Sequence, residues 1–121
     1  MFMLDLKSRV PIYEQLKSKT LELIMAGVLA TDDKMPSVRT LARDLGVNPN
    51  TIQKAYQDME KDGIIYSVTG KGSFVAAKPQ DNDVAVNAAA EKLFKAVYEA
   101  RLYGVERETA METVNKAYEK E

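Results

Sequence analysis

The chain has 121 residues, 45% hydrophobic and 29% charged, which is typical of a folded protein with one domain and a small appendage. It has no cysteine and no histidine, which excludes disulfide bonds, a thiolate nucleophile, a cysteine zinc site and the usual general base. The net charge is -1, so a nucleic-acid partner would have to meet a local cationic patch. The start of the chain lacks a signal-peptide pattern, and no apolar run approaches the ~20 residues that span a bilayer. We therefore expect a cytoplasmic protein without a membrane partner.

The first predicted helix begins at Pro11, because proline suits a first helical turn, where its missing N–H is not needed. From Ile12 to Ile24 apolar residues recur at three- and four-residue spacing, which is typical of a helix that buries one face. Gly27 and the polar turn after it end this helix.

A second and a third helix are predicted on the two sides of a tight turn. Ser37 is a suitable N-cap for the second helix, and Gly46 supplies the left-handed residue that ends it. Asn48 and Pro49 favour a new helix start within about one turn, and Gly63 ends the third helix. The expected buried faces are Val38, Leu41, Ala42 and Leu45 in the second helix, and Ile52, Ala55, Tyr56 and Met59 in the third.

The remainder of the chain predicts a β-hairpin, a linker and two further helices. Two β-favouring runs, Ile64 to Val68 and Ser73 to Val75, flank Gly70-Lys71-Gly72 and predict the hairpin. Residues 77–83 are polar and form the predicted linker. Beyond it, apolar residues at steps of four and three predict a helix with a narrow seam that ends at Gly104, and a shorter helix follows.

This order of elements predicts a mainly α fold with a small β-hairpin wing. Residues 1–76 would form a winged helix-turn-helix, and residues 84–121 a helical dimerisation tail. In such motifs the helix after the turn enters the major groove and reads base edges with its first residues. Amides bond adenine, and Lys or Arg reaches guanine or phosphate. The candidate DNA-binding residues on this pattern are Arg39, Arg43, Asn48, Asn50, Thr51, Gln53, Lys54, Gln57 and Lys71.

Other interpretations stay open on the pattern alone. The capping residues and arginines could be ordinary helix-start chemistry and a solvated face, and a winged helix can act as a protein-interaction adaptor that never binds nucleic acid. No spacing of carboxylates, Lys or Ser marks a catalytic constellation, so an enzyme is not expected. The "QDND" segment lacks the glycine and the later glutamate of a calcium loop, so we expect neither a metal nor another cofactor.

Three stretches carry a family resemblance: "PIYEQLKSKTLELIMAGVL", "DKMPSVRTLARDLGVNPNTIQKAYQDMEKDGII" and "GKGSFV". Together they resemble the DNA-binding domain of the GntR family of bacterial transcription regulators, from about Pro11 to Val75. "GVNPNTIQKAY" and the short two-helix tail are similar to the YtrA branch, whose members repress nearby operons, often ones that encode ABC transporters. The resemblance implies a repressor whose "PSVR" and "GKG" motifs meet DNA, which adds Ser37 and Gly72 to the candidates.

Two departures from the family pattern matter. Other branches carry arginines on the recognition helix where this chain has Pro49 and Gln53, so their operator sequence does not transfer. Thr31-Asp32 stands where proline and glycine are usual. Because aspartate tolerates a left-handed conformation, we expect little change in that turn.

The tail is expected to form a homodimer. Two helices cannot bury both of their faces alone, and a two-fold pair matches a palindromic operator. Folding of the tail onto its own DNA-binding domain is the alternative. Tyr98 and Tyr103 could instead line a cleft for an unidentified small-molecule effector. The expected interface residues are Val86, Ala90, Leu93, Phe94, Val97 and Tyr98.

Overall fold

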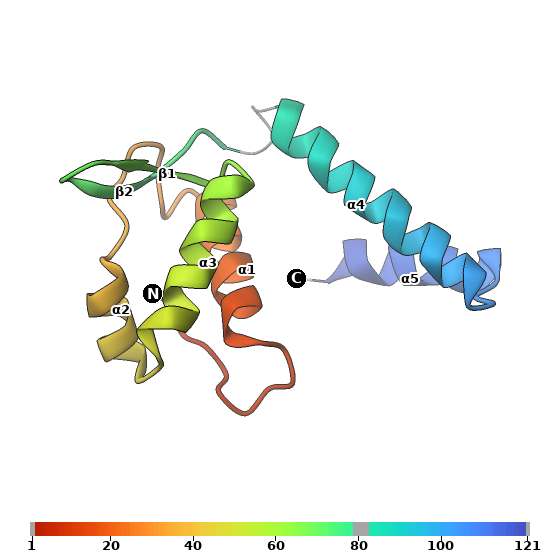
Figure 1. Cartoon of the computed structure of the whole chain (residues 1–121). Helices are drawn as coiled ribbons and strands as arrows, with labels where there is room; N and C mark the ends of the chain where they lie inside the picture. Colours follow the sequence, from red (N-terminus) through yellow and green to blue (C-terminus); the bar gives the residue numbers. More distant parts are fainter. Residues whose placement is uncertain (1, 79–82, 121) are drawn as a thin grey trace. The chain divides into compact units, whose positions relative to one another are not determined.

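The computed structural model describes residues 2–78 and 83–120 (Figure 1). The chain divides into two units, Met1–Ala85 and Val86–Glu121, and each is described by itself. Most of the predicted linker, with the first three residues of "QDND", lies outside the described residues. The boundaries 1–76, 77–83 and 84–121 therefore stay predictions.

The order of elements is the predicted one, three helices, an antiparallel hairpin and two more helices (Figure 1). The mainly helical fold with a small wing is thus confirmed. The first strand starts one residue later than predicted, at Ile65, and the second starts one residue earlier, at Gly72. No described helix is long and apolar enough to cross a membrane. The elements are α1 (Ile12–Met25), α2 (Val38–Leu45), α3 (Pro49–Lys61), β1 (Ile65–Val68), β2 (Gly72–Val75), α4 (Asp83–Leu102) and α5 (Arg107–Glu119).

The turn between α2 and α3 is built by the capping residues that the sequence indicated. The Ser37 hydroxyl accepts the Thr40 N–H at 3.0 Å at the start of α2. Gly46 ends α2 at φ 69°, in the left-handed region. The Asn48 side chain then accepts the Asn50 N–H at 2.8 Å, and Pro49 opens α3. Each helix end is satisfied locally, so the turn needs few residues.

The core of the larger unit lies where α1, α3 and the hairpin meet. Leu16 of α1, Ile52 and Met59 of α3 and Val75 of β2 are fully buried. Burial of such side chains is the main favourable term in folding, about 1.5–3 kcal/mol for each large one. Because α3 contributes the whole predicted stripe to this core, its other faces are left for solvent.

The segment before α2 pairs with the wing, which the sequence did not predict. The Asp32 N–H donates to the Val75 carbonyl at 2.7 Å, and the Val75 N–H donates to Asp33 at 2.8 Å. The Met35 N–H donates to Ser73 at 2.8 Å. Asp32 itself adopts φ 71°, as expected from the tolerance of aspartate for that region. Its carboxylate accepts the Tyr66 hydroxyl at 2.6 Å, which also raises the pKa of that phenol.

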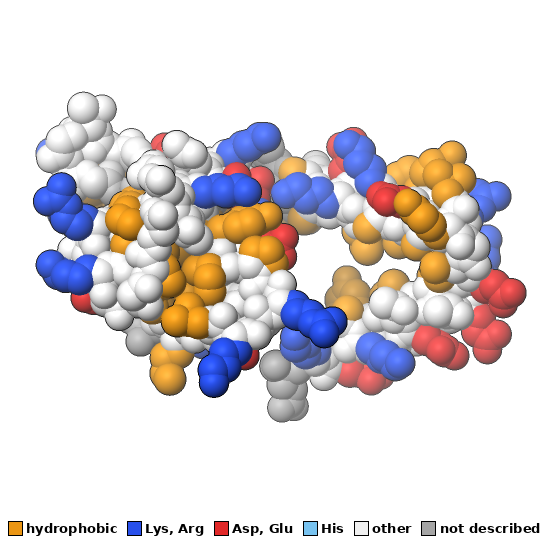
Figure 2. Space-filling model, turned by 60° about the horizontal axis from the view of Figure 1, so that its bottom comes forward, with side chains coloured by type: hydrophobic (Ala, Val, Ile, Leu, Met, Phe, Trp, Pro, Cys, Tyr) orange, Lys and Arg blue, Asp and Glu red, His pale blue; other side chains and the backbone are white. Residues whose placement is uncertain are grey.

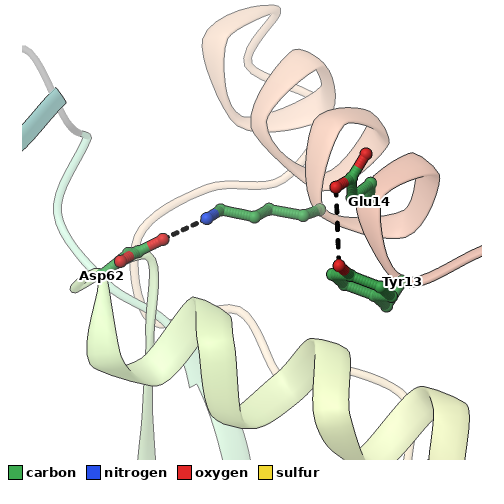
Figure 3. Close-up of polar contacts among 4 residues, drawn as sticks. Tyr13, Glu14 and Asp62 are labelled. Atoms are coloured by element: carbon green, nitrogen blue, oxygen red, sulfur yellow. Dashed lines mark hydrogen bonds and ion pairs between the residues drawn. The ribbon is translucent and has the colours of Figure 1, made fainter. Parts of the chain in front are cut away.

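Helix α1 is tied to the end of α3 by an ion pair. Lys17 donates to the carboxylate of Asp62, just after α3, as Figure 3 shows. On the same helix the Tyr13 hydroxyl lies 3.5 Å from Glu14 (Figure 3). Both partners of the Lys17 pair are partly exposed, so it fixes geometry more than it adds stability.

The residues before α1 also contribute to the core. Phe2 is buried, 8% exposed. The Gln15 carboxamide accepts the Asp5 N–H at 2.9 Å and donates to the carbonyls of Asp5 and Val10 at 2.9 and 2.8 Å. One buried aromatic and one amide therefore order a stretch that carries no periodic pattern.

The second unit is a pair of helices joined at Gly104, where φ is 95°. Helix α4 ends at Leu102, as the position of that glycine predicted. No described side chain of α5 is buried. The unit therefore has no core of its own within the chain.

The hydrogen bond that joins α3 to the segment before α2 gives a first prediction. The Tyr56 hydroxyl donates to the Pro36 carbonyl at 2.6 Å, and burial raises the pKa of this phenol well above its ordinary value of 10.0. Tyr56→Phe should lower the free energy of unfolding by about 1 kcal/mol, measured by urea denaturation at pH 7. The exposed Tyr118 gives the control, Tyr118→Phe, which should change nothing.

The same variant has a pH signature. Above pH 10 the unfolded wild type releases the Tyr56 proton while the folded protein keeps it, so stability falls as pH rises. Tyr56→Phe should lack this part of the fall. Parallel stability curves for the two proteins between pH 9 and 11 would contradict a buried, protonated phenol; the window follows from the ordinary pKa of about 10.

Candidate nucleic-acid interface

The first turns of α3 present a polar surface. Asn50, Gln53 and Gln57 are exposed, whereas Thr51 is half-buried. They alternate with Ile52 and the rest of the buried stripe, because residues three or four apart share a face of a helix. The amides can therefore donate and accept at base edges without leaving the core unfilled.

Two predicted site residues already have structural tasks. The Ser37 hydroxyl accepts from Thr40 and Asn48 accepts from Asn50, as described above, although both residues are exposed. Their capping roles account for their presence without DNA. Contact with DNA stays a prediction for both.

The arginines of α2 are exposed and four residues apart, so they lie one turn from each other. Arg43 Nε lies 3.8 Å from the Asp44 carboxylate, and both side chains are largely exposed. Such a pair is worth little and is screened by salt. Arg39 makes no ion pair with the described residues, so its guanidinium is available for a partner.

Lys54 is placed differently from the other α3 side chains. Its ammonium lies 4.1 Å from the centroid of the Tyr13 ring, over α1. A cation in this position is attracted by the face of the ring, about 0.5–1 kcal/mol at an exposed site. The side chain is thus held beside α1, and its predicted contact with DNA remains untested.

The wing carries Lys71 at its tip. Its N–H donates to Val68 at 2.9 Å, which closes the turn, and its side chain is exposed. Gly72 follows at φ 115°, a region that other residues rarely adopt. Because Val68 pairs with Gly72, Lys71 is the last residue of the turn that connects the two strands.

A hollow of about 440 Å³ separates the wing from the start of α2. Lys34 and Lys71 are its charged lining residues. Lys34 was not predicted as a site residue, because the sequence placed it only in the polar turn that follows the first helix. Only the pairing of that segment with β2 brings it to the wing.

Charge is distributed unevenly along the chain. Residues 1–78 carry 11 Lys and Arg against 9 Asp and Glu, whereas residues 79–121 carry 6 against 9. Figure 2 shows Lys and Arg side chains at the edge of the larger unit, next to white polar surface. The DNA-binding candidates therefore lie in the cationic part of a slightly acidic chain.

Every predicted interface residue lies on α4 and is exposed. Leu93 is 53% exposed and Phe94 is 70% exposed. The rings of Phe94 and Tyr98 stack with centroids 6.3 Å apart. Figure 2 shows hydrophobic side chains on the surface of this unit. The remaining predicted interface residues are also exposed: Val86, Ala90, Val97 and Tyr98.

A second hollow, of about 610 Å³, lies between α4 and α5. Val97, Arg101 and Met111 are among its lining residues, but Tyr98 and Tyr103 are not. The cleft suggested for those two tyrosines therefore stays a prediction. No group of three or more Asp and Glu in the described part of the chain is arranged to hold a metal ion.

The family model of the bacterial regulatory proteins of the gntR family matches residues 12–75, from α1 to the end of β2. The chain is 36% identical over 118 residues to the HTH-type transcriptional repressor YtrA of Bacillus subtilis (strain 168), covering 96% of this chain and 91% of that protein. The predicted resemblance to the YtrA branch is confirmed.

Two solved structures extend the comparison. A transcriptional antiterminator from Listeria monocytogenes EGD-e has a TM-score of 0.67 and 34% identity, covering 98% of this chain and 90% of that one. The DNA-binding domain of AraR in complex with operator ORX1 has a TM-score of 0.54 and 36% identity. The match covers 61% of this chain and 92% of that domain. The chain belongs to the GntR family of DNA-binding transcriptional regulators.

Proposed function

We propose that the chain is a repressor that binds a palindromic operator as a homodimer and acts in the cytoplasm on an operon near its own gene. An ABC-transporter operon is the first candidate, since the YtrA branch often controls one. The observation that carries the proposal is the split of α3 into a fully buried stripe and an exposed row of amides. Arg39 of α2 and the wing belong to the same unit as that row.

The relatives support the same conclusion. The Bacillus subtilis relative is named a repressor, and the AraR domain was solved with its operator. In helix-turn-helix proteins the helix after the turn lies in the major groove. We assign that place to α3, base reading to Asn50 and Gln53, and backbone contact to Lys71.

The homodimer is proposed from the exposed seam of α4. Val86, Ala90, Leu93 and Val97 follow one another at steps of four, three and four, so they lie on one face. Contiguous apolar surface of this kind marks a contact with another protein. A second copy offers the same surface, and its two-fold symmetry repeats the recognition helix for the second half-site.

The direct test is a mobility shift with DNA from upstream of the chain's own gene. A repressor should give a complex whose affinity falls as salt rises and exceeds that for a random duplex of equal length. Absence of any salt-dependent affinity would instead favour a protein-interaction adaptor. Transcription from the same DNA, measured with and without the protein, distinguishes repression from activation.

Arg39 should contribute a large share of operator affinity. Its exposed guanidinium has no carboxylate partner among the described residues, so Arg39→Ala should weaken operator binding by about 1–3 kcal/mol, the usual worth of a good guanine contact. The measurement is a titration at fixed salt, with thermal melting to confirm that the fold is intact. Arg39→Lys should recover affinity only if the contact is to phosphate, because lysine cannot make the bidentate bond. An affinity within about twofold of wild type for Arg39→Ala would remove the residue from the site.

Gln53 and Lys71 should affect binding in different ways. Gln53→Ala should relax the preference at particular base pairs, because an amide reads base edges. Lys71→Ala should weaken all sequences and lower the salt slope by about one unit, because one phosphate contact is lost. Binding to a panel of operator variants at several salt concentrations measures both effects. If Lys71→Ala keeps the full slope, the wing makes no phosphate contact.

The seam should determine assembly. Leu93→Glu would bury an unpaired charge twice at a symmetric interface, at a cost of several kcal/mol, and should give a monomer at micromolar concentration. The control is Ala88→Glu, an exposed position that the helical period of about 100° per residue places on the opposite side of α4. Sedimentation of the three proteins tests this. A monomeric wild type, or a dimeric Leu93→Glu, would place the interface elsewhere.

A further inference from the structure

The hollow between the wing and the start of α2 has a lining that is unusual for this chain. It contains two lysines and several hydroxyl side chains, and it contains no Asp or Glu. The hollow between α4 and α5, by comparison, is lined by Glu106 as well as by Arg101 and Arg107. A concave surface with unopposed cations concentrates anions. The residues with hydroxyl groups that line it are Ser37, Tyr56, Ser67, Thr69 and Ser73, and the Tyr56 hydroxyl already donates to the Pro36 carbonyl.

Lys34 is the best fixed cation of this hollow. Its backbone pairs with Phe74 of β2, and the next residue, Met35, donates to Ser73 at 2.8 Å. The backbone of Lys34 is therefore anchored to the wing. Lys71 lies in the turn between the two strands, where its own N–H donates to the Val68 carbonyl. The Lys34 side chain is exposed and pairs with no carboxylate in the described part of the chain.

Gly72 leaves the space that the Lys34 stem occupies. A Cβ atom at this position would lie 3.2 Å from Lys34 Cε and 4.0 Å from its Nζ. A side chain there would press on the lysine, and the φ of 115° already favours glycine. The wing motif and Lys34 thus fit each other, although they are far apart in the sequence.

We propose that this hollow holds a backbone phosphate of the operator and that Lys34 is its principal cation. The inference rests on the proposed function and adds a residue to it. The ligand chemistry is a phosphodiester, which carries one negative charge and whose oxygens accept hydrogen bonds from the Lys34 ammonium and from a lining hydroxyl such as that of Thr69. Such a contact positions the protein on the duplex and carries no base preference.

The experiment compares Lys34→Gln with wild type on two probes, the duplex from upstream of the chain's own gene and a random duplex of equal length. Lys34→Gln should lower the salt slope by about one unit on both, because one phosphate contact is lost. Lys34→Arg should restore the slope, since it keeps the charge. The control is Lys61→Gln, which removes an exposed lysine at the far end of α3 and should leave the slope unchanged.

The outcomes separate this inference from the proposed function. Wild type that binds neither duplex overturns the proposed function and this inference with it. If the wild type binds and Lys34→Gln has the same salt slope as the wild type, only the inference is overturned. A change confined to particular base pairs also overturns it, because it would make Lys34 a base reader.

Inorganic phosphate is the third probe, since a free anion has the same chemistry. We expect phosphate to bind the full chain only weakly, in the millimolar range, and we expect Lys34→Gln to abolish this binding. Changes in the amide chemical shifts of Thr69 to Gly72 during a phosphate titration measure it. Micromolar binding of free phosphate, combined with an unchanged DNA slope in the variant, would make the hollow a small-anion site and overturn the assignment to the operator backbone.

Discussion

The burial of one face of α3 is the constraint on which the rest of the larger unit depends. Ile52 and Met59 have no exposed surface, and the helix that carries them cannot rotate without leaving cavities in the core. Because the stripe is fixed inward, the amides between its members are fixed outward. The position of the exposed amides of α3 is thus a consequence of core packing. The Lys17–Asp62 pair in addition ties the end of α3 to α1.

The features that sequence predicted well are those with a local physical cause. The caps at Ser37 and Asn48 depend on bonds between residues two or three apart, and Gly46 depends on its own backbone freedom. The left-handed Asp32 belongs to the same class. Each could be predicted because the residue type and its neighbours carry the whole reason for the conformation.

The features that sequence missed depend on distant partners. Lys34 belongs by sequence to the polar turn after the first helix, and only strand pairing with Phe74 gives it a place at the wing. The position of Lys54 over Tyr13 requires the spacing of two packed helices, which no periodicity contains. Phe2 carried no repeating pattern, so its burial could not be distinguished from an exposed terminus. The sequence therefore predicts which residue types belong to the candidate site, but it does not predict how they are arranged in space.

The pairing of the Asp32–Met35 segment with β2 has a consequence for the order of folding. Helix α3 contacts both α1 and α2, and these contacts involve no residue beyond Lys61. The bond from the Val75 N–H to the Asp33 carbonyl requires β2, which follows all three helices in the chain. On a growing chain, the three helices can associate before β2 has left the ribosome, whereas the wing and its cationic hollow cannot. The wing and its hollow are therefore the last parts of this unit that can form during synthesis.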